Sequence, residues 1–177
     1  MLLTALVLAD THLRDGDRKW LPPSVLEHLA AADVVLHAGD VVEPGALQRI
    51  RDATPAPVHA VLGNNDTRLD LPDHLELELA GVAVGLIHDS GPAAGRERRM
   101  RRRFPGCQVV VFGHSHIPID AEGVDGQRLF NPGSPTVRRR QPVGTFGVLR
   151  LADGRLADHL ILPVEPPPAP AGRGVGG

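Results

Sequence analysis

Five polar clusters, each placed directly after a short apolar run, constrain this chain more than any other feature. The apolar runs are continuous and rich in Val, Leu and Ile, which is typical of strands buried on both faces. They cover residues 2–9, 33–38, 58–62, 82–87 and 109–112. The clusters that follow them are Asp10-Thr11-His12, Gly39-Asp40, Gly63-Asn64-Asn65-Asp66, His88-Asp89 and Gly113-His114-Ser115-His116. The pattern predicts buried strands with a polar group at every carboxyl end.

Helix-like stretches separate the first three runs. They cover residues 22–32 and 44–53, each with a proline near its start, and they predict a strand-helix-strand rhythm with right-handed crossovers and a parallel sheet. Later, alternating residues predict a hairpin over 75–87, and a second hairpin is expected over 144–162. A third helix is expected over 91–104, where six arginines indicate a solvated basic face or, alternatively, a phosphate-steering surface.

The polar clusters hold the side-chain types that bind metal ions. In open α/β sheets ligands bind beyond the carboxyl ends of the strands, so clusters far apart in sequence can converge there. The candidate ligands are Asp10, His12, Asp40, Asn64, His88, His114 and His116. Seven side chains exceed what one tetrahedral ion uses, and mixed oxygen and imidazole sets suit manganese, iron or zinc. Gly39, Gly63 and Gly113 are expected to let the backbone turn sharply and approach the ions.

Composition narrows the class of protein. The chain has 177 residues, 42% of them hydrophobic and 23% charged, with a net charge of -2, which fits one globular domain. Cys107 is the only cysteine, which excludes a disulfide framework and favours a reducing compartment. Near-neutral charge and four Phe, one Trp and no Tyr argue against a dedicated nucleic-acid binder.

The two ends of the chain carry further expectations. Residues 1–9 are apolar but lack a basic leader and are too short to span a membrane, so we expect a buried first strand and a cytoplasmic protein. Residues 1–162 are expected to form the domain, and the Pro/Gly-rich residues 163–177 a disordered tail. The oligomeric state stays open, with a homodimer as the commonest soluble assembly.

The ordered set D-x-H, GD, GN-x-D, H and GH-x-H resembles the calcineurin-like metallophosphoesterase superfamily over residues 1 to about 162. The turn Asn131-Pro132-Gly133-Ser134 is similar to one in its small bacterial and archaeal phosphodiesterase branch. The resemblance implies an α/β (α+β) fold, a four-layer αββα sandwich with mixed sheets between helices.

The resemblance also implies a ligand assignment and a mechanism. One metal would be held by Asp10, His12, Asp40 and His116, and the other by Asp40, Asn64, His88 and His114, with Asp40 as the bridge. The implied activity is that of a phosphoric diester hydrolase: hydroxide held between two divalent ions attacks the phosphorus of a small phosphate ester. Manganese is the expected metal, with zinc, iron and nickel as alternatives. The implied catalytic residues are Asn65 and His114.

The chain departs from the family pattern beside these ligands. Many members carry a His where this chain has Asn65, and a neutral amide cannot act as a general acid. Activated diesters are therefore favoured over phosphomonoesters. Two alternatives stay open: a phosphomonoesterase or nucleotidase, and a non-catalytic binding scaffold, as in a retromer subunit whose metal positions are eroded. The residues His88-Asp89-Ser90 also depart from the branch, so the loop after His88 is expected to differ.

Several residues near the polar clusters each have both a structural and a functional interpretation. Asp66 is expected either to accept a hydrogen bond that orients the preceding loop or a metal-bound His, or simply to cap its own loop. His37 is expected to be a core residue, with support of a ligand as the alternative. The run Arg138-Arg139-Arg140 fits either a substrate phosphate clamp or a solvated surface.

Overall fold

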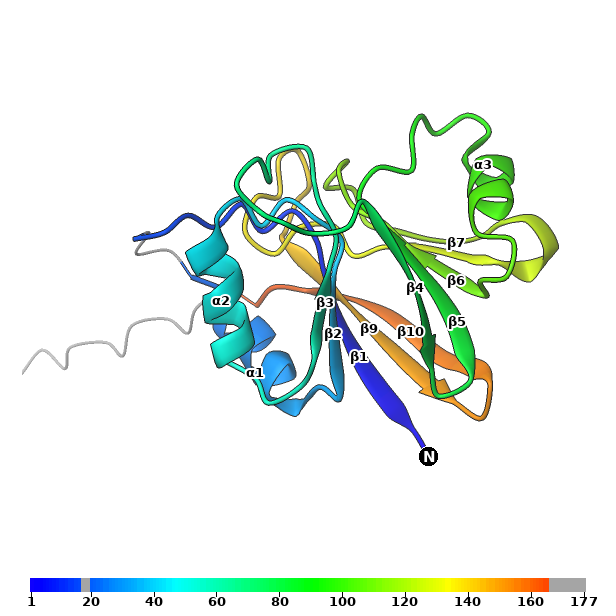
Figure 1. Ribbon diagram of the computed structural model, residues 1–177, viewed down its shortest axis with the longest axis horizontal. Coiled ribbons are helices and arrows are strands. Elements are labelled where there is room, and N and C mark those ends of the chain that lie inside the picture. The colour runs from blue at the N-terminus through cyan, green and yellow to red at the C-terminus, as the bar shows by residue number, and fades with distance from the viewer. Residues whose placement is uncertain (17–19, 166–177) are drawn as a thin grey trace, which may run out of the picture.

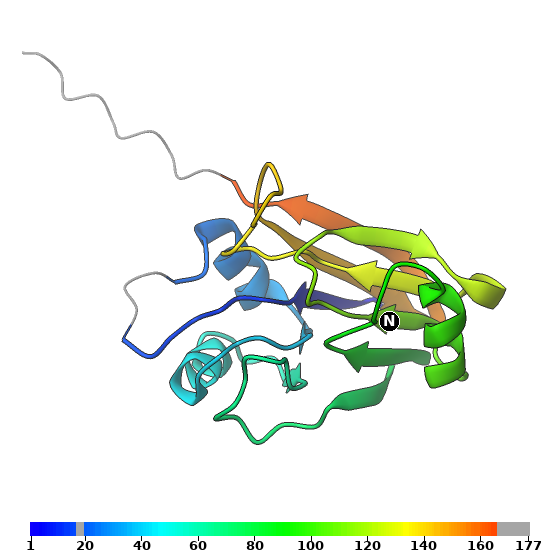
Figure 2. The same ribbon diagram turned by 90° about the horizontal axis from the view of Figure 1, so that it is seen from above.

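Two five-stranded sheets pack face to face and helices cover their outer faces. The computed structural model describes residues 1–16 and 20–165. The strand orders are β10-β9-β1-β2-β3 and β4-β5-β6-β8-β7. From one side of the molecule to the other, α1 and α2, the first sheet, the second sheet and α3 follow in turn (Figures 1 and 2). The fold is therefore the expected αββα sandwich.

The first sheet is parallel at one edge and antiparallel at the other. Parallel strands β1 (Leu3–Leu8), β2 (Val34–His37) and β3 (Val58–Ala60) are joined by α1 (Pro23–Ala31) and α2 (Pro44–Asp52), as predicted. Both helices carry a proline in the first turn, where its missing N–H leaves no bond unmade. The predicted second hairpin is β9 (Thr145–Ala152) and β10 (Arg155–Pro163), and β9 lies antiparallel to β1.

The second sheet contains two strands that the sequence pattern does not reveal. It begins with the predicted hairpin of β4 (His74–Leu79) and β5 (Val82–Ile87), and β6 (Val109–Val111) lies parallel to β5. The unpredicted strands are β7 (Ile119–Glu122) and β8 (Arg128–Asn131), joined by a turn of 3-10 helix, Val124–Gly126. Strand β8 pairs with β6, so this sheet is mixed as well.

Three apolar clusters hold the layers together. One lies between the sheets and contains Val7, Leu36, Val84 and Val111, all with no exposed surface. A second cluster packs Val25 of α1 and Ile50 of α2 against the outer face of the first sheet. The third places Met100 and Phe104, at the end of α3 (Arg96–Arg103), on the outer face of the second sheet.

The arginines of α3 bind neighbouring groups as well as solvent. Arg99 donates from Nε to the Ser90 carbonyl at 2.7 Å and so fastens the loop after His88 to the helix. Arg101 pairs with Asp125 at 3.2 Å, and Arg103 lies 3.0 Å from the His74 ring. The basic face expected from the sequence therefore also stabilises the loops around the helix.

The described chain continues past the boundary expected at residue 162. Strand β10 ends at Pro163, and the Val164 N–H donates to the Gly144 carbonyl at 2.8 Å. Most of the expected tail, residues 166–177, lies outside the described residues. Among the residues that the structure covers, no helix is long and apolar enough to cross a membrane.

Candidate metal centre

The candidate ligands meet at one edge of the sandwich because strands of both sheets end there. Backbone hydrogen bonds tie the segments together: the Asp10 N–H donates to the Gly39 carbonyl at 3.0 Å and the Gly113 N–H donates to the His88 carbonyl at 2.9 Å. The expectation of one crevice beyond an open sheet needs correction, since the clusters follow β1, β2 and β3 of one sheet and β5 and β6 of the other.

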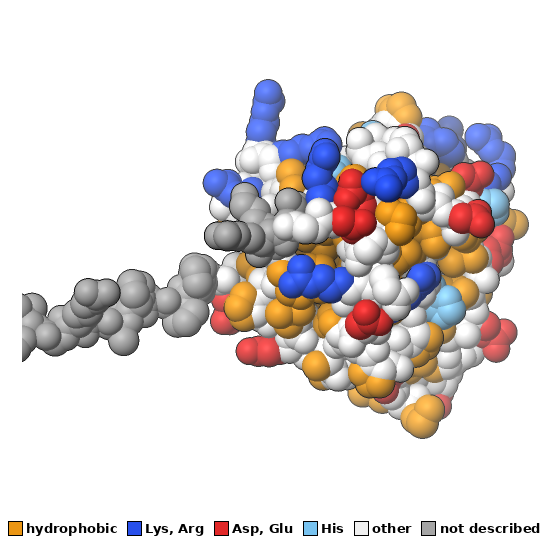
Figure 3. Space-filling view, turned by 60° about the vertical axis from the view of Figure 1, so that its left-hand side comes forward, with side chains coloured by type: hydrophobic (Ala, Val, Ile, Leu, Met, Phe, Trp, Pro, Cys, Tyr) orange, Lys and Arg blue, Asp and Glu red, His pale blue; other side chains and the backbone are white. Residues whose placement is uncertain are grey.

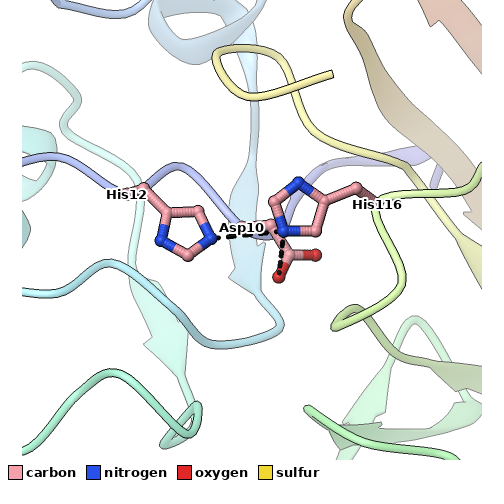
Figure 4. A group of neighbouring side chains, drawn as sticks. All are labelled: Asp10, His12 and His116. Carbon is pink, nitrogen blue, oxygen red and sulfur yellow. Dashed lines mark hydrogen bonds and ion pairs between the residues drawn. The ribbon is translucent and has the colours of Figure 1, made fainter. Parts of the chain in front are cut away.

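Asp10, His12 and His116 form the first donor group. His116 Nε2 lies 3.2 Å from His12 Nε2 and 3.4 Å from Asp10 Oδ1. The three side chains point toward one another, as Figure 4 shows. His116 Nδ1 faces the Val137 carbonyl. Because a carbonyl only accepts, Nδ1 carries the proton and Nε2 keeps its lone pair for a metal ion.

Asn64, His88 and His114 form the second donor group. Asn64 Oδ1 lies 3.0 Å from both His88 Nε2 and His114 Nδ1. His88 Nδ1 donates to the Ala38 carbonyl at 2.8 Å, which again leaves Nε2 available as a ligand. Asp40 lies between the two groups, with Oδ2 3.6 Å from His12 Nε2 and 3.6 Å from His88 Nε2.

The Asp10 carboxylate tests whether a cation fits this site. Both of its oxygens are buried and have no hydrogen-bond partner among the described residues. Burial raises the pKa of Asp10 to about 8, and the charge of Asp40 acts in the same direction. An unpartnered buried carboxylate costs free energy unless a cation compensates its charge. The donor set therefore fits a divalent metal ion.

The backbone at the ligand positions is strained. Five of the seven candidate ligands have positive φ, in the left-handed region that favours glycine. The values are 54° at Asp10, 45° at His12, 59° at Asp40, 68° at His114 and 59° at His116. Such conformations cost about 1–3 kcal/mol each and persist only where the surroundings impose them, as they do at functional sites.

The glycines of the clusters make room for neighbouring ligand side chains and for the backbone of adjacent segments. A Cβ on Gly39 would lie 2.7 Å from His88 Nδ1, and one on Gly113 would lie 2.9 Å from Asp10 Oδ2. A Cβ on Gly63 would overlap the backbone nitrogen and Oδ1 of Asp40. Each glycine thus lets two segments pack at a separation that no other residue permits.

Asp66 fixes two of the ligand loops. This buried carboxylate accepts backbone N–H groups from Asp40 at 2.8 Å, Val42 at 2.6 Å and Gly63 at 2.8 Å. The two roles expected as alternatives are therefore both present: the same Asp66 carboxylate caps its own loop at Gly63 and orients the loop of Asp40 and Val42. None of its bonds goes to a histidine of the described chain.

We expect Asp66→Asn to weaken both metal binding and folding. An amide has one acceptor oxygen and brings an NH₂ group toward N–H donors, so at least one buried N–H loses its partner. The unfolding free energy should fall by about 1–3 kcal/mol and the metal affinity by about 10–100-fold. Urea unfolding and metal titration measure the two effects, with exposed Asp70→Asn as the control. Wild-type values for both would contradict this role.

Four supporting hydrogen bonds were not anticipated from the sequence. Asn65 donates from its backbone N–H to Asp40 Oδ1 at 2.8 Å and from Nδ2 to Asp40 Oδ2 at 2.7 Å. The Ser134 hydroxyl donates to the Asp10 carbonyl at 2.7 Å, and the Thr136 hydroxyl donates to the Thr11 carbonyl at 2.6 Å. The Asn-Pro-Gly-Ser turn at residues 131–134 was the sequence signal that pointed to the loop holding Ser134 and Thr136.

His37 stays outside the donor groups. It is fully buried, and its Nε2 lies 2.9 Å from the hydroxyl of Thr11. In the sequence, Thr11 stands between the candidate ligands Asp10 and His12. Burial lowers the pKa of His37 to about 3, so the ring is neutral. It is thus a core residue that also contacts the first ligand loop.

A sandwich of two mixed sheets with carboxylate, amide and imidazole donors gathered at one edge defines a class of metal-binding proteins. A family model described as the calcineurin-like phosphoesterase superfamily domain matches residues 3–154. A probable metallophosphoesterase from Methanothermobacter thermautotrophicus is 34% identical over 160 residues, covering 88% of this chain and 90% of the relative. The chain therefore belongs to the calcineurin-like phosphoesterase superfamily, in its small archaeal and bacterial branch.

Solved structures share the fold at low identity. Vacuolar Protein Sorting 29 from Cryptosporidium parvum superposes with a TM-score of 0.74 at 20% identity, covering 92% of this chain and 98% of that one. A structure described as a novel archaeal phosphodiesterase superposes with a TM-score of 0.71 at 20% identity, covering 91% and 99%. These similarities concern the fold. The family and the donor set together support a metal-dependent phosphoesterase.

Proposed function

We propose that this chain is a metal-dependent phosphodiesterase that holds two divalent ions, with Asp40 shared between them. The observation that carries the proposal is the position of Asp40 Oδ2, 3.6 Å from one imidazole nitrogen of each donor group. Asp10, His12 and His116 would complete one set, and Asn64, His88 and His114 the other. A bridging carboxylate is how two ions share seven ligands.

Manganese is the metal we propose, with zinc, iron and nickel as alternatives. Oxygen and imidazole donors without thiolate suit these ions better than copper(I). Cys107 is no competing ligand, because its thiol is directed to Glu76 and burial raises its pKa to about 11. Thiolate, the metal-binding form, is thus scarce at neutral pH.

The bound ions would lower the pKa of water and neutralise charge on the phosphate oxygens. The protein's own part is to orient the ligands. Asn65 holds both oxygens of Asp40, and the Ala38 and Val137 carbonyls fix the tautomers of His88 and His116. Because Asn65 is a neutral amide engaged with Asp40, it supplies no proton to a leaving group. The site accordingly favours diesters with good leaving groups.

His114 is the residue of the donor set that we place nearest the substrate. It is exposed, whereas His88 and His116 are buried. Its Nδ1 faces Asn64, which leaves Nε2 for a contact with substrate.

The test is hydrolysis of an aryl phosphodiester and the matching monoester by metal-stripped protein, with and without manganese. We expect diester turnover that needs the metal and exceeds monoester turnover. Preferential monoester turnover would favour the phosphomonoesterase alternative. Bound metal without turnover of either ester would favour a scaffold, a role for which the intact donor set offers no reason.

Of the run Arg138-Arg139-Arg140, Arg139 is the residue that we propose to bind the substrate phosphate. It is exposed and follows the turn whose Ser134 and Thr136 hydroxyls dock on the first ligand loop, and its own φ is 49°. Burial lowers the pKa of His116 to about 4, and the charge of Arg139 acts in the same direction. The guanidinium therefore lies within electrostatic reach of the first donor group.

We expect Arg139→Gln to raise KM for an aryl phosphodiester by about tenfold, because a charge-assisted bond to phosphate is lost. The substitution should have little effect on metal content, because Arg139 forms no hydrogen bond with a candidate ligand in the described part of the chain. Steady-state kinetics and metal analysis check this, with Arg140→Gln as the matched control from the same run. Equal KM values for both variants and the wild type would remove Arg139 from the site.

A further inference from the structure

A hollow adjoins the candidate metal centre and is open to substrate. It has a volume of about 340 Å³, and its lining includes His12, Asn64 and Asn65 of the candidate metal centre. The other lining residues are Arg14, Val42, Glu43, Thr67 and Arg68. Its volume is in the range of small-molecule sites. One arm of a phosphate ester held at the ions would therefore have room in this hollow.

The hollow is basic. It holds two guanidinium groups and the carboxylate of Glu43, which gives it a net positive charge. Glu43 is engaged on both oxygens, since Oε2 accepts the Asp15 N–H at 2.7 Å and Oε1 lies 3.6 Å from Arg68 NH1. Figure 3 shows basic side chains gathered along the upper edge of the molecule, the edge at which β1 and β2 end.

The backbone that carries these two arginines is fixed. Leu13, directly before Arg14, is buried and forms an isolated β-bridge with Val42. Arg68 follows the segment held by the buried Asp66 carboxylate, and the Leu69 N–H donates to the Asp66 carbonyl at 3.2 Å. Arg14 and Arg68 thus extend into the hollow from two anchored loops, one after β1 and one after β3.

The hollow is poorly suited to a nucleobase. Among the described residues, its lining includes no Phe, Tyr or Trp side chain, and its one imidazole, His12, is a candidate metal ligand whose ring stacks on that of His116, so it offers no free ring on which a base could stack. Trp20 lines the adjoining surface, but the Arg49 guanidinium lies over its ring, 3.8 Å from the centroid. Arginine forks and amide groups instead match phosphate or carboxylate.

We infer that the hollow is a second anion subsite, so that the preferred substrate is a small phosphodiester carrying a further phosphate or carboxylate on one arm. This inference rests on the proposed phosphodiesterase function and specifies its substrate class. The scissile phosphate would lie at the metal centre, and the second anionic group would lie between Arg14 and Arg68.

The experiment uses three 4-nitrophenyl phosphodiesters whose second arm is an ethyl group ending in hydroxyl, carboxylate or phosphate. With the manganese-loaded full chain, kcat/KM should be about tenfold higher for both anionic esters than for the hydroxyl ester. The advantage should shrink as salt is raised, because exposed charges are screened. An advantage for only one anionic ester would identify which of the two groups the subsite takes.

The double variant Arg14→Gln, Arg68→Gln should reduce the ratio of anionic to hydroxyl ester turnover to about one. Arg155→Gln is the control, since it removes an exposed arginine at the opposite end of the strands. Unfolding midpoints confirm that the variants fold. Turnover of all three esters at equal efficiency would overturn the subsite and leave the phosphodiesterase standing.

Absence of turnover would instead count against the phosphodiesterase, and binding then decides the subsite. Titration calorimetry of the three esters against zinc-loaded wild type and double variant measures it directly. Tighter binding of the anionic esters to the wild type alone would support the subsite. Equal affinities for all three esters would overturn it.

Discussion

Asp40→Asn should abolish metal-dependent hydrolysis, with kcat/KM falling at least about a thousandfold, because the proposed pair of water-activating ions would lose its shared ligand. Asp40 Oδ2 is the oxygen that lies between the two donor groups, and Oδ1 is already engaged with the Asn65 N–H. An amide removes the negative charge and turns an NH₂ group toward one of these positions. One acceptor oxygen cannot replace both.

Metal content separates this effect from a general defect. Wild-type protein should be stabilised against unfolding by added manganese, as any ligand of the native state stabilises it, and the variant should lose most of that increment. Asp89→Asn is the matched control, an exposed carboxylate directly after the ligand His88. If Asp40→Asn kept two ions per chain and turnover within tenfold of wild type, the shared-carboxylate assignment would be wrong.

Gly63→Ala should disable the site without replacing a ligand. The new Cβ would overlap the backbone nitrogen and Oδ1 of Asp40, and neither atom can move freely, because the nitrogen donates to Asp66 and Oδ1 accepts the Asn65 N–H. We expect the unfolding free energy to fall by about 1–3 kcal/mol, as for other overpacked sites, and metal affinity to fall at least about tenfold.

Gly106→Ala provides the control for this substitution, because no atom lies within 4 Å of the position its Cβ would take. Chemical denaturation of the metal-free proteins and metal titration measure both quantities. If Gly63→Ala had wild-type stability and metal affinity, the Asp40 loop would be free to shift. That result would contradict the anchoring role of the hydrogen bonds that Asp66 and Asn65 make with Asp40.

Much of the first sheet could be predicted from the sequence, because β1, β2 and β3 are continuous apolar runs separated by helices that begin with proline. Strands β7 and β8 could not. Each has four residues, and β7 reads Ile-Asp-Ala-Glu with alternate residues exposed, a pattern too short to distinguish from a loop. The sequence of an apolar run also does not indicate which sheet the strand joins. Two sheets were therefore expected only from the resemblance to the family.

The candidate site, like the fold, could be predicted from the sequence only in part. The seven candidate ligands were recognisable because metal-binding side chains at successive strand ends are an unusual pattern, and the structure brings them together. The supporting contacts depend on backbone groups far away in sequence: Ser134 bonds to the carbonyl of Asp10, 124 residues earlier. No local pattern records such a pairing, and the same holds for the bonds from Asn65 to Asp40.

The origin of the two donor groups has a consequence for the whole fold. Each group combines loops from both halves of the sandwich: Asp10 and His12 follow β1 while His116 follows β6, and Asn64 follows β3 while His88 follows β5. An ion in either group would cross-link the two sheets at their shared edge. Metal affinity and the packing of the sandwich are then thermodynamically linked, so each ion strengthens the sheet interface as much as that interface strengthens its binding.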